Sequence, residues 1–117
     1  MRDPYEHGLE LLAAGEWFAA HEAFEDAWRA AEPPERDFLQ GLVHVAVANY
    51  HAEATGRPVA CERQLEKAAR RLGSYVPSHR GVDVDELLAW IGAARGRFPD
   101  LPPLPVSRRA RGSGTGG

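Results

Sequence analysis

The segment from Glu35 to Ala54 is apolar on most of its circumference when it is projected as a helix. The apolar positions are Phe38, Leu39, Leu42, Val43, Val45, Ala46, Val47, Ala48 and Tyr50. A helix of this kind has to be covered by its neighbours. No segment of the chain shows the alternating pattern of a half-buried strand, so those neighbours should also be helices. The sequence therefore predicts an all-α bundle with this third helix buried at its centre.

Glycine and proline divide the rest of the chain into four further helical segments, which makes about five helices. They are expected at about residues 4–14, at about 17–31, after the break at 55–58 and at about 83–98, with a loop over 73–81. Because 117 residues suffice for one core of ordinary size, residues 1–98 are predicted to form one helical domain. Residues 99–117 are rich in Pro, Gly, Ser and Arg, which predicts a disordered, flexible C-terminal tail.

Charge and cysteine content narrow the classes of protein. The chain has 17 acidic and 14 basic residues, a balance that does not favour nucleic acid as a partner. No stretch reaches the roughly 18 uninterrupted apolar residues of a membrane span, so no membrane association is expected. Cys61 is the only cysteine and lies on an apolar helical stripe, which predicts a buried, inert thiol. A cytoplasmic protein is the expectation.

The segment WFAAHEAFEDAW, residues 17–28, combines aromatic side chains with a histidine and a glutamate. At about 100° per residue, Trp17, His21, Phe24, Glu25 and Trp28 fall within roughly one quarter of the helical circumference. His21 and Glu25 therefore share the aromatic face and are predicted to point into the protein. A buried carboxylate needs partners, because burying an unpaired charge is costly.

One stripe of the central helix is polar. It carries Gln40, His44, Val47 and His51 at spacings of four, three and four. If the second and third helices pack antiparallel, as their short connection favours, this stripe faces His21 and Glu25. Two or three imidazoles and a carboxylate suit a divalent transition metal, whose identity the pattern does not give.

The predicted metal ligands are accordingly His21, Glu25, His51 and His44, in a pocket lined by Trp28, Gln40 and Trp17. The alternative is a satisfied polar core, in which His21 and Glu25 pair across one helical turn and His51 is hydrated at a helix end. A His-Glu-x-x-Glu pattern is not the zinc-protease motif. Whether the protein is an enzyme stays open.

The same residues resemble a known family, domain of unknown function 309, whose members are small helical proteins of bacteria and archaea. His21, Glu25 and Trp28 resemble its H-x-x-x-E-x-x-W motif, and DFLQGLVHVAVANYH and GVDVDELL are similar to two further blocks over residues 5–98. The resemblance implies an all-α fold and a motif suspected of binding metal, with His51 as a matching histidine. His44 departs from the pattern, since it stands where Gln is usual.

Two other functions compete with a metal or small-ligand site. The order Gly8, Ala20, Phe24 and Ala27 resembles a tetratricopeptide unit, which would make the chain a protein-interaction module. No second copy follows at that repeat's period. A homodimer is the other reading, with Trp90 as its expected exposed contact. His7 and His79 are expected to be solvated, and Arg108, Arg109 and Arg111 are expected to be a solubilising tail or a contact for an acidic partner.

Overall fold

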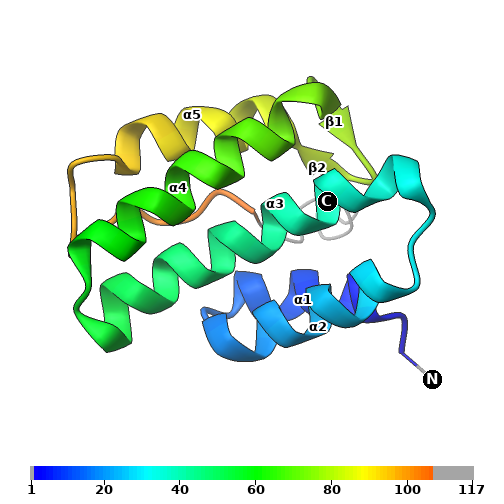
Figure 1. Ribbon diagram of the computed structural model, residues 1–117, viewed down its shortest axis with the longest axis horizontal. Helices are drawn as coiled ribbons and strands as arrows, with labels where there is room; N and C mark the ends of the chain where they lie inside the picture. The colour runs from blue at the N-terminus through cyan, green and yellow to red at the C-terminus, as the bar shows by residue number, and fades with distance from the viewer. Residues whose placement is uncertain (1, 107–117) are drawn as a thin grey trace, which may run out of the picture.

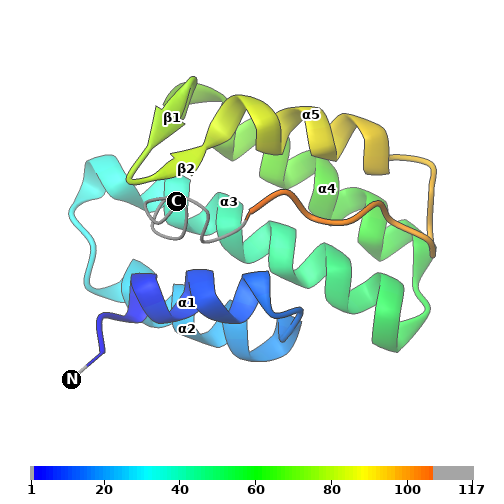
Figure 2. The same cartoon turned by 180° about the vertical axis from the view of Figure 1, so that it is seen from behind.

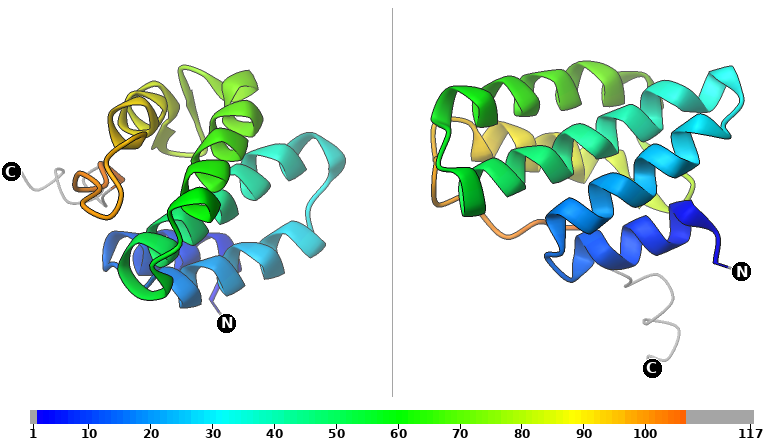
Figure 3. Two further views of the ribbon diagram at one scale, coloured as in Figure 1. Left: turned by 60° about the vertical axis from the view of Figure 1, so that its left-hand side comes forward. Right: turned by 60° about the horizontal axis from the view of Figure 1, so that its bottom comes forward.

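The computed structural model describes residues 2–106 and forms a bundle in which the helices surround α3 (Figure 1). The helices are α1 (Pro4–Ala13), α2 (Trp17–Arg29), α3 (Pro33–Tyr50), α4 (Pro58–Leu72) and α5 (Val84–Ala94). The longest helix, α3, packs against α2 on one side and α4 on the other, and α1 covers α2 (Figure 3). The predicted all-α bundle with a central third helix is confirmed.

Local sequence signals account for the helix ends. The Asp3 side chain caps α1 by accepting a hydrogen bond of 3.2 Å from the Tyr5 backbone N–H. Pro33 opens α3 at its first position, where the missing N–H costs nothing, so this helix begins two residues earlier than predicted. Its end continues as a π-helix, His51–Thr55, which Gly56 terminates in a left-handed conformation with φ of 67°.

The core is built around α3. Its largest fully buried side chains include Tyr5 of α1, Phe24 of α2 and Phe38 of α3. Two glycines set the closest helix approaches: a Cβ at Gly8 would lie 2.6 Å from the Phe24 ring, and one at Gly41 would lie 2.6 Å from Leu72. Larger residues at these positions would push α1 from α2 and α3 from α4.

Residues 73–83 contain regular structure where the sequence predicted a loop. A short 3-10 helix, Gly73–Tyr75, precedes two antiparallel strands, β1 (Ser78–His79) and β2 (Val82–Asp83). Arg80 and Gly81 join them with φ values of 48° and 83°, as a tight hairpin turn of the primed type requires. Two-residue strands are too short to leave an alternating pattern, so no signal of them was visible in the sequence.

Residues 99–106, the first part of the predicted tail, fold back onto the bundle, whereas residues 107–117 lie outside the described residues. Figure 2 shows this segment crossing between α5 and the α1–α2 hairpin. Leu101, Leu104 and Val106 pack against the core, and Trp90 Nε1 donates a hydrogen bond of 2.9 Å to the Pro102 carbonyl. Prolines prevent a helix here, but the apolar residues between them still bury surface.

The expectation for Trp90 changes with this segment. Trp90 is only 5% exposed, so it is not the exposed dimer contact that was predicted. Arg108, Arg109 and Arg111 lie outside the described residues. Within residues 2–106, no helix is both long enough and apolar enough to cross a membrane.

Candidate functional site

His21 and Glu25 form a pair at the rim of the bundle. The distance from His21 Nε2 to Glu25 Oε2 is 3.3 Å, and their side chains are 23% and 40% exposed. The prediction that His21 and Glu25 point into the interior of the protein is therefore wrong. The buried residues of α2 are the small Ala20 and Ala23 together with Phe24, and they turn a different arc of the helix inward. The projection took the large aromatic side chains as the mark of the buried face. The small side chains of alanine let α2 pack closely on α1 and α3, so the alanine-containing face is the buried one.

The polar stripe of α3 does not stay together as one site. Gln40 lies beside α2, whereas His44 turns toward α4, where a hydrogen bond of 2.7 Å joins its Nδ1 to Gln64 Oε1. His51 bonds within the π-helix, with 2.8 Å between its Nδ1 and Thr55 Oγ1. A straight stripe of twelve residues spans more than one neighbour, so its ends meet different helices.

The predicted ligands do not provide a metal centre by themselves. Nowhere in residues 2–106 do three or more His, Cys, Asp or Glu side chains gather in a way that would hold a metal ion. Of the four predicted ligands, only His21 and Glu25 are paired. His21 Nδ1 is buried without a hydrogen-bond partner, which leaves Nε2 as its accessible nitrogen. A two-ligand pair falls short of the three or four protein ligands usual for bound transition metals.

A hollow of about 500 Å³ lies next to this pair, between α2, α3 and α4. Its lining residues are Glu25, Trp28, Arg29, Arg36, Asp37, Gln40 and Arg71. Three of these, Glu25, Trp28 and Gln40, belong to the predicted site. Trp17, which was predicted to line the same pocket, packs against the core instead. The sequence therefore predicted three of the residues that line this hollow.

Three arginines and two carboxylates set the charge of the hollow. Arg71 Nη1 lies 2.7 Å from Asp37 Oδ1, and Arg29 is held by Asp26 at 2.6 Å and by Glu25 at 3.9 Å. Arg36 differs from both. No carboxylate among the described residues pairs with it, and its guanidinium carbon lies 5.1 Å from the centroid of the Trp28 ring.

The sequence alone predicted no binding role for Arg29, Arg36, Asp37 or Arg71. Helical spacing offered a signal for two of them, since Arg29 follows Glu25 by four residues and Arg36 precedes Gln40 by four. Arg71 had no such signal. Its partner, Asp37, lies 34 residues away in the chain.

A second polar cluster ties the hairpin turn to α1 and α3. A hydrogen bond of 2.8 Å joins His79 Nε2 to Glu35 Oε1, and the same oxygen lies 3.8 Å from Arg80 Nη1. The Arg80 guanidinium lies 3.9 Å from the Tyr5 ring centroid, and the Tyr5 hydroxyl donates to the Arg80 carbonyl at 2.8 Å. Burial raises the pKa of Tyr5 well above its ordinary value of 10.0.

The remaining histidines and the cysteine can now be compared with expectation. His79 is not solvated as predicted, and His7 is half-buried with its Nδ1 unbonded. Burial lowers the pKa of His44 below its ordinary 6.5, with the positive charges of Arg71, Lys67 and Arg70 acting in the same direction and the Gln64 hydrogen bond opposing it. Cys61 is buried, and burial raises its thiol pKa to about 11, as expected of an inert thiol.

The fold and the site thus define a small helical bundle with an arginine-lined hollow beside an H-x-x-x-E-x-x-W motif. Residues 5–63 match the model of a family described as Domain of unknown function (DUF309), and the chain belongs to this family. The match covers His21, Glu25, Trp28 and the whole of α3, whereas GVDVDELL lies beyond it. No curated protein and no solved structure matched the chain.

Proposed function

We propose that the hollow between α2, α3 and α4 binds a small organic anion that carries a carboxylate or phosphate group. The observation that carries this proposal is Arg36, the lining arginine with no carboxylate partner among the described residues. A guanidinium is a planar, permanently charged group with several donors, and it matches carboxylate and phosphate oxygens.

Trp28 restricts the position of the Arg36 guanidinium by stacking against it. The indole face lies against the guanidinium, and a distant hydrogen bond of 3.4 Å from Arg36 Nε to the Ala31 carbonyl fixes one edge of the group. The remaining N–H groups have no partner among the described residues. A stacked guanidinium loses less conformational freedom on binding than a free one, so this arrangement lowers the entropic cost of capturing an anion.

Glu25 and Gln40 supply acceptors and an amide to the same hollow. Glu25 carries the carboxylate that His21 contacts from outside the hollow, and Gln40 offers both a carbonyl and an NH₂ group. A ligand that fits this lining has an anionic group for Arg36 and a hydroxyl or amine for Glu25. The proposal is one of binding and names no reaction.

Titration followed by NMR tests the proposal. Succinate, benzoate and inorganic phosphate are added in turn to ¹⁵N-labelled protein, and shifts are expected at the Trp28 indole N–H and the Arg36 Nε–H. Arg36→Gln should weaken binding by about tenfold or more, which corresponds to about 1.4 kcal/mol. Arg97→Gln is the matched control, because Arg97 is exposed and outside the hollow. Equal affinity in the two variants would contradict the proposal.

The predicted metal site is tested in the same series. Zn²⁺, Ni²⁺ and Mn²⁺ replace the organic anions, and elemental analysis is made on protein without a histidine tag. A stoichiometric ion that is lost in His21→Ala would favour a metal role for His21 and Glu25, with further ligands from water, substrate or another chain. If the protein contains no metal ion and Arg36→Gln loses anion binding, the results would favour an anion site in the hollow without a metal.

An interaction module is the second candidate, and the packing of the α1–α2 hairpin favours it. The contact between Gly8 and Phe24 is close enough that a Cβ on Gly8 would lie 2.6 Å from the ring, as in hairpins that pair a glycine with an aromatic residue. Under this reading His21 and Glu25 only stabilise α2. A protein without affinity for any of the anions or metals, but with a stoichiometric protein partner, would support it.

A further inference from the structure

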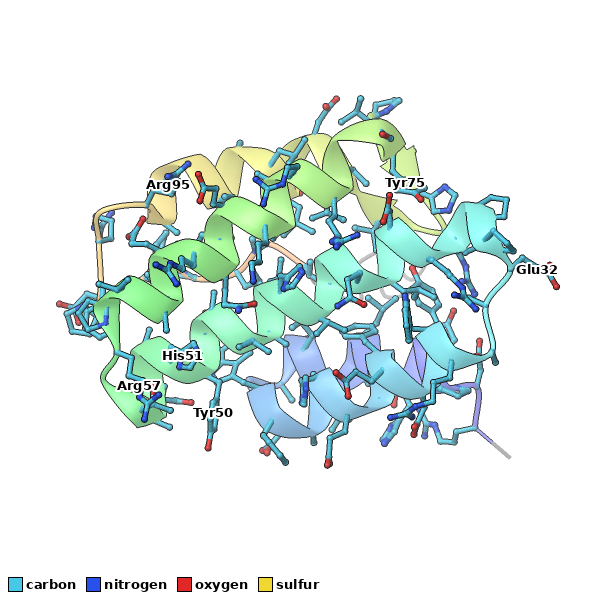
Figure 4. The ribbon with its side chains drawn as sticks, viewed as in Figure 1. Glu32, Tyr50, His51, Arg57, Tyr75 and Arg95 are labelled. Atoms are coloured by element: carbon cyan, nitrogen blue, oxygen red, sulfur yellow. The ribbon has the colours of Figure 1, made fainter. Side chains whose placement is uncertain are left out.

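Large apolar side chains are exposed at three places in the described residues: Phe18 is 52% exposed, Val59 is 66% exposed and Val76 is 45% exposed. Two of these, Phe18 and Val59, lie toward the same end of the bundle. The ring of Phe18 contacts Tyr50, with 5.6 Å between centroids, and Figure 4 shows Tyr50, His51 and Arg57 at the same end of the view. The Gly56 backbone N–H, which belongs to the segment leading into α4, donates a hydrogen bond of 2.9 Å to the His51 carbonyl. The exposed Phe18 ring and the start of α4 therefore lie toward the same end of α3.

Val59 belongs to a second hollow, of about 560 Å³, at the start of α4. Its lining residues are Gly56, Arg57, Pro58, Val59, Ala60, Arg63, Gln64 and Lys67. The lining has three cations and no carboxylate. None of these cations forms an ion pair with a described residue, whereas Arg29, Arg71 and Arg95 elsewhere in the bundle all do. This hollow is suited to an occupant that is apolar at its centre and acidic around it.

The surface around Phe18 has that chemistry. Glu22 follows Phe18 by one helical turn and is exposed, and Glu16 is exposed two residues before it. The charge of the whole segment agrees: residues 2–32 contain eight acidic and two basic residues, a net charge of −6, whereas residues 57–72 contain five basic and two acidic residues, a net charge of +3. The acidic and basic parts of one chain thus complement each other.

We propose that the protein forms a dimer in which Phe18 of each copy inserts into the α4 hollow of the other, with Glu22 facing Arg63 and Lys67. Phe18 and the hollow lie toward one end of the molecule. A single two-fold axis can therefore place the Phe18 side chain of each copy in the hollow of the other. Such an isologous contact closes at two copies. Phe18 does not fill the hollow of its own chain, because none of the lining residues of that hollow comes from α2.

Sedimentation of the full chain tests the dimer directly. The wild-type protein should be dimeric at low ionic strength and should dissociate progressively as salt screens the charges. Phe18→Ala and Arg63→Glu should each weaken association by about tenfold or more. Arg97→Glu is the matched control, because it makes the same charge change on an exposed residue outside both surfaces.

A mixing experiment distinguishes this pairing from a general charge effect. Glu22→Arg and Arg63→Glu each place like charges together in their own homodimers, so each variant alone should be monomeric. A one-to-one mixture should form dimers again, because each contact then joins opposite charges. Circular dichroism of each variant checks that it is folded.

Three results would overturn the proposal. A wild-type protein that stays monomeric at all concentrations and at low salt would do so, as would a mixture that fails to associate when both variants are folded. Species that grow beyond two copies would show head-to-tail contact in place of the two-fold one. Binding of the anion probes in the α2–α3–α4 hollow is measured separately, so the two proposals succeed or fail independently.

Discussion

Two histidine–glutamate pairs lie in this bundle, and they differ in how the chain brings their partners together, although their side chains are similarly exposed. His21 and Glu25 belong to one helix and are 3.3 Å apart at a half-exposed rim. His79 and Glu35 come from the hairpin and from α3, are 44 residues apart in the chain and approach to 2.8 Å. The first pair is evident from helical spacing, whereas only the fold brings the second together.

The surroundings of the two pairs indicate different roles. His79 packs against Phe38 and Tyr75, with ring centroids 4.6 Å and 4.8 Å away, and so joins the hairpin to the core. His21 has one ring neighbour, Phe18, which is itself half-exposed. A pair that connects distant segments should stabilise the fold, whereas a pair within one helix should matter more for what binds beside it.

The largest expected effect is the loss of the His79 ring. His79→Ala removes a hydrogen bond and two aromatic contacts, so the free energy of unfolding should fall by about 2 kcal/mol. Chemical denaturation measures it. His21→Ala is the internal comparison, and equal losses in the two variants would remove the distinction between the pairs.

Double-mutant cycles should separate the pair energies from the packing energies. The coupling between His79 and Glu35 is expected to be about 1 kcal/mol, because their contact is a short hydrogen bond of 2.8 Å. The coupling between His21 and Glu25, which are 3.3 Å apart, is expected to be about 0.3 kcal/mol, as in other pairs one helical turn apart. A larger coupling for the second pair would contradict this order.

His44 offers a histidine without a carboxylate partner, and its effect should appear as pH dependence. Burial lowers its pKa in the folded protein, so below its ordinary value of 6.5 the unfolded chain takes up the proton more readily than the folded one. The stability that the neutral imidazole provides is complete above pH 6.5 and is lost as the pH falls toward the folded pKa. His44→Gln should flatten the fall in unfolding free energy between pH 7 and pH 5.

His51 is the control for this measurement. Burial lowers its pKa too, with help from Arg57, but its side chain bonds only within the π-helix. His51→Gln should therefore flatten the pH dependence less than His44→Gln. A larger change in the His51 variant would show that the contact with α4 is not the origin of the effect.

The fold was largely predictable because each helix carries its own signals. The apolar circumference of α3, the capping by Asp3 and the glycine and proline breaks all act within a few residues. The hairpin turn at Arg80 and the packing of Leu104 depend on contacts made only in the folded chain. Short-range patterns do not encode such contacts.

The candidate site was likewise predictable only where short-range patterns carry the signal. Glu25, Trp28 and Gln40 were predicted from helical projections, and the structure brings them to one hollow. The projections failed for His44 because they assumed one facing helix, whereas α3 has α2 and α4 as neighbours. Arg36 was overlooked because an unpaired arginine on a helix resembles a solvated one until its stacking on Trp28 is seen.

The smallest expected effect is the most informative about function. His21→Ala removes the contact with Glu25, but it also removes a buried Nδ1 that has no hydrogen-bond partner, so the two changes offset and stability should fall by no more than about 0.5 kcal/mol. Anion affinity should change more than stability, because Glu25 then loses its neighbour at the edge of the hollow and is held by Arg29 alone. His21→Gln should retain part of that affinity, since its amide can still donate to Glu25. If both variants bind the anion probes as the wild type does, Glu25 does not need His21, and the pair at the rim has only the weak structural role of an exposed helical contact.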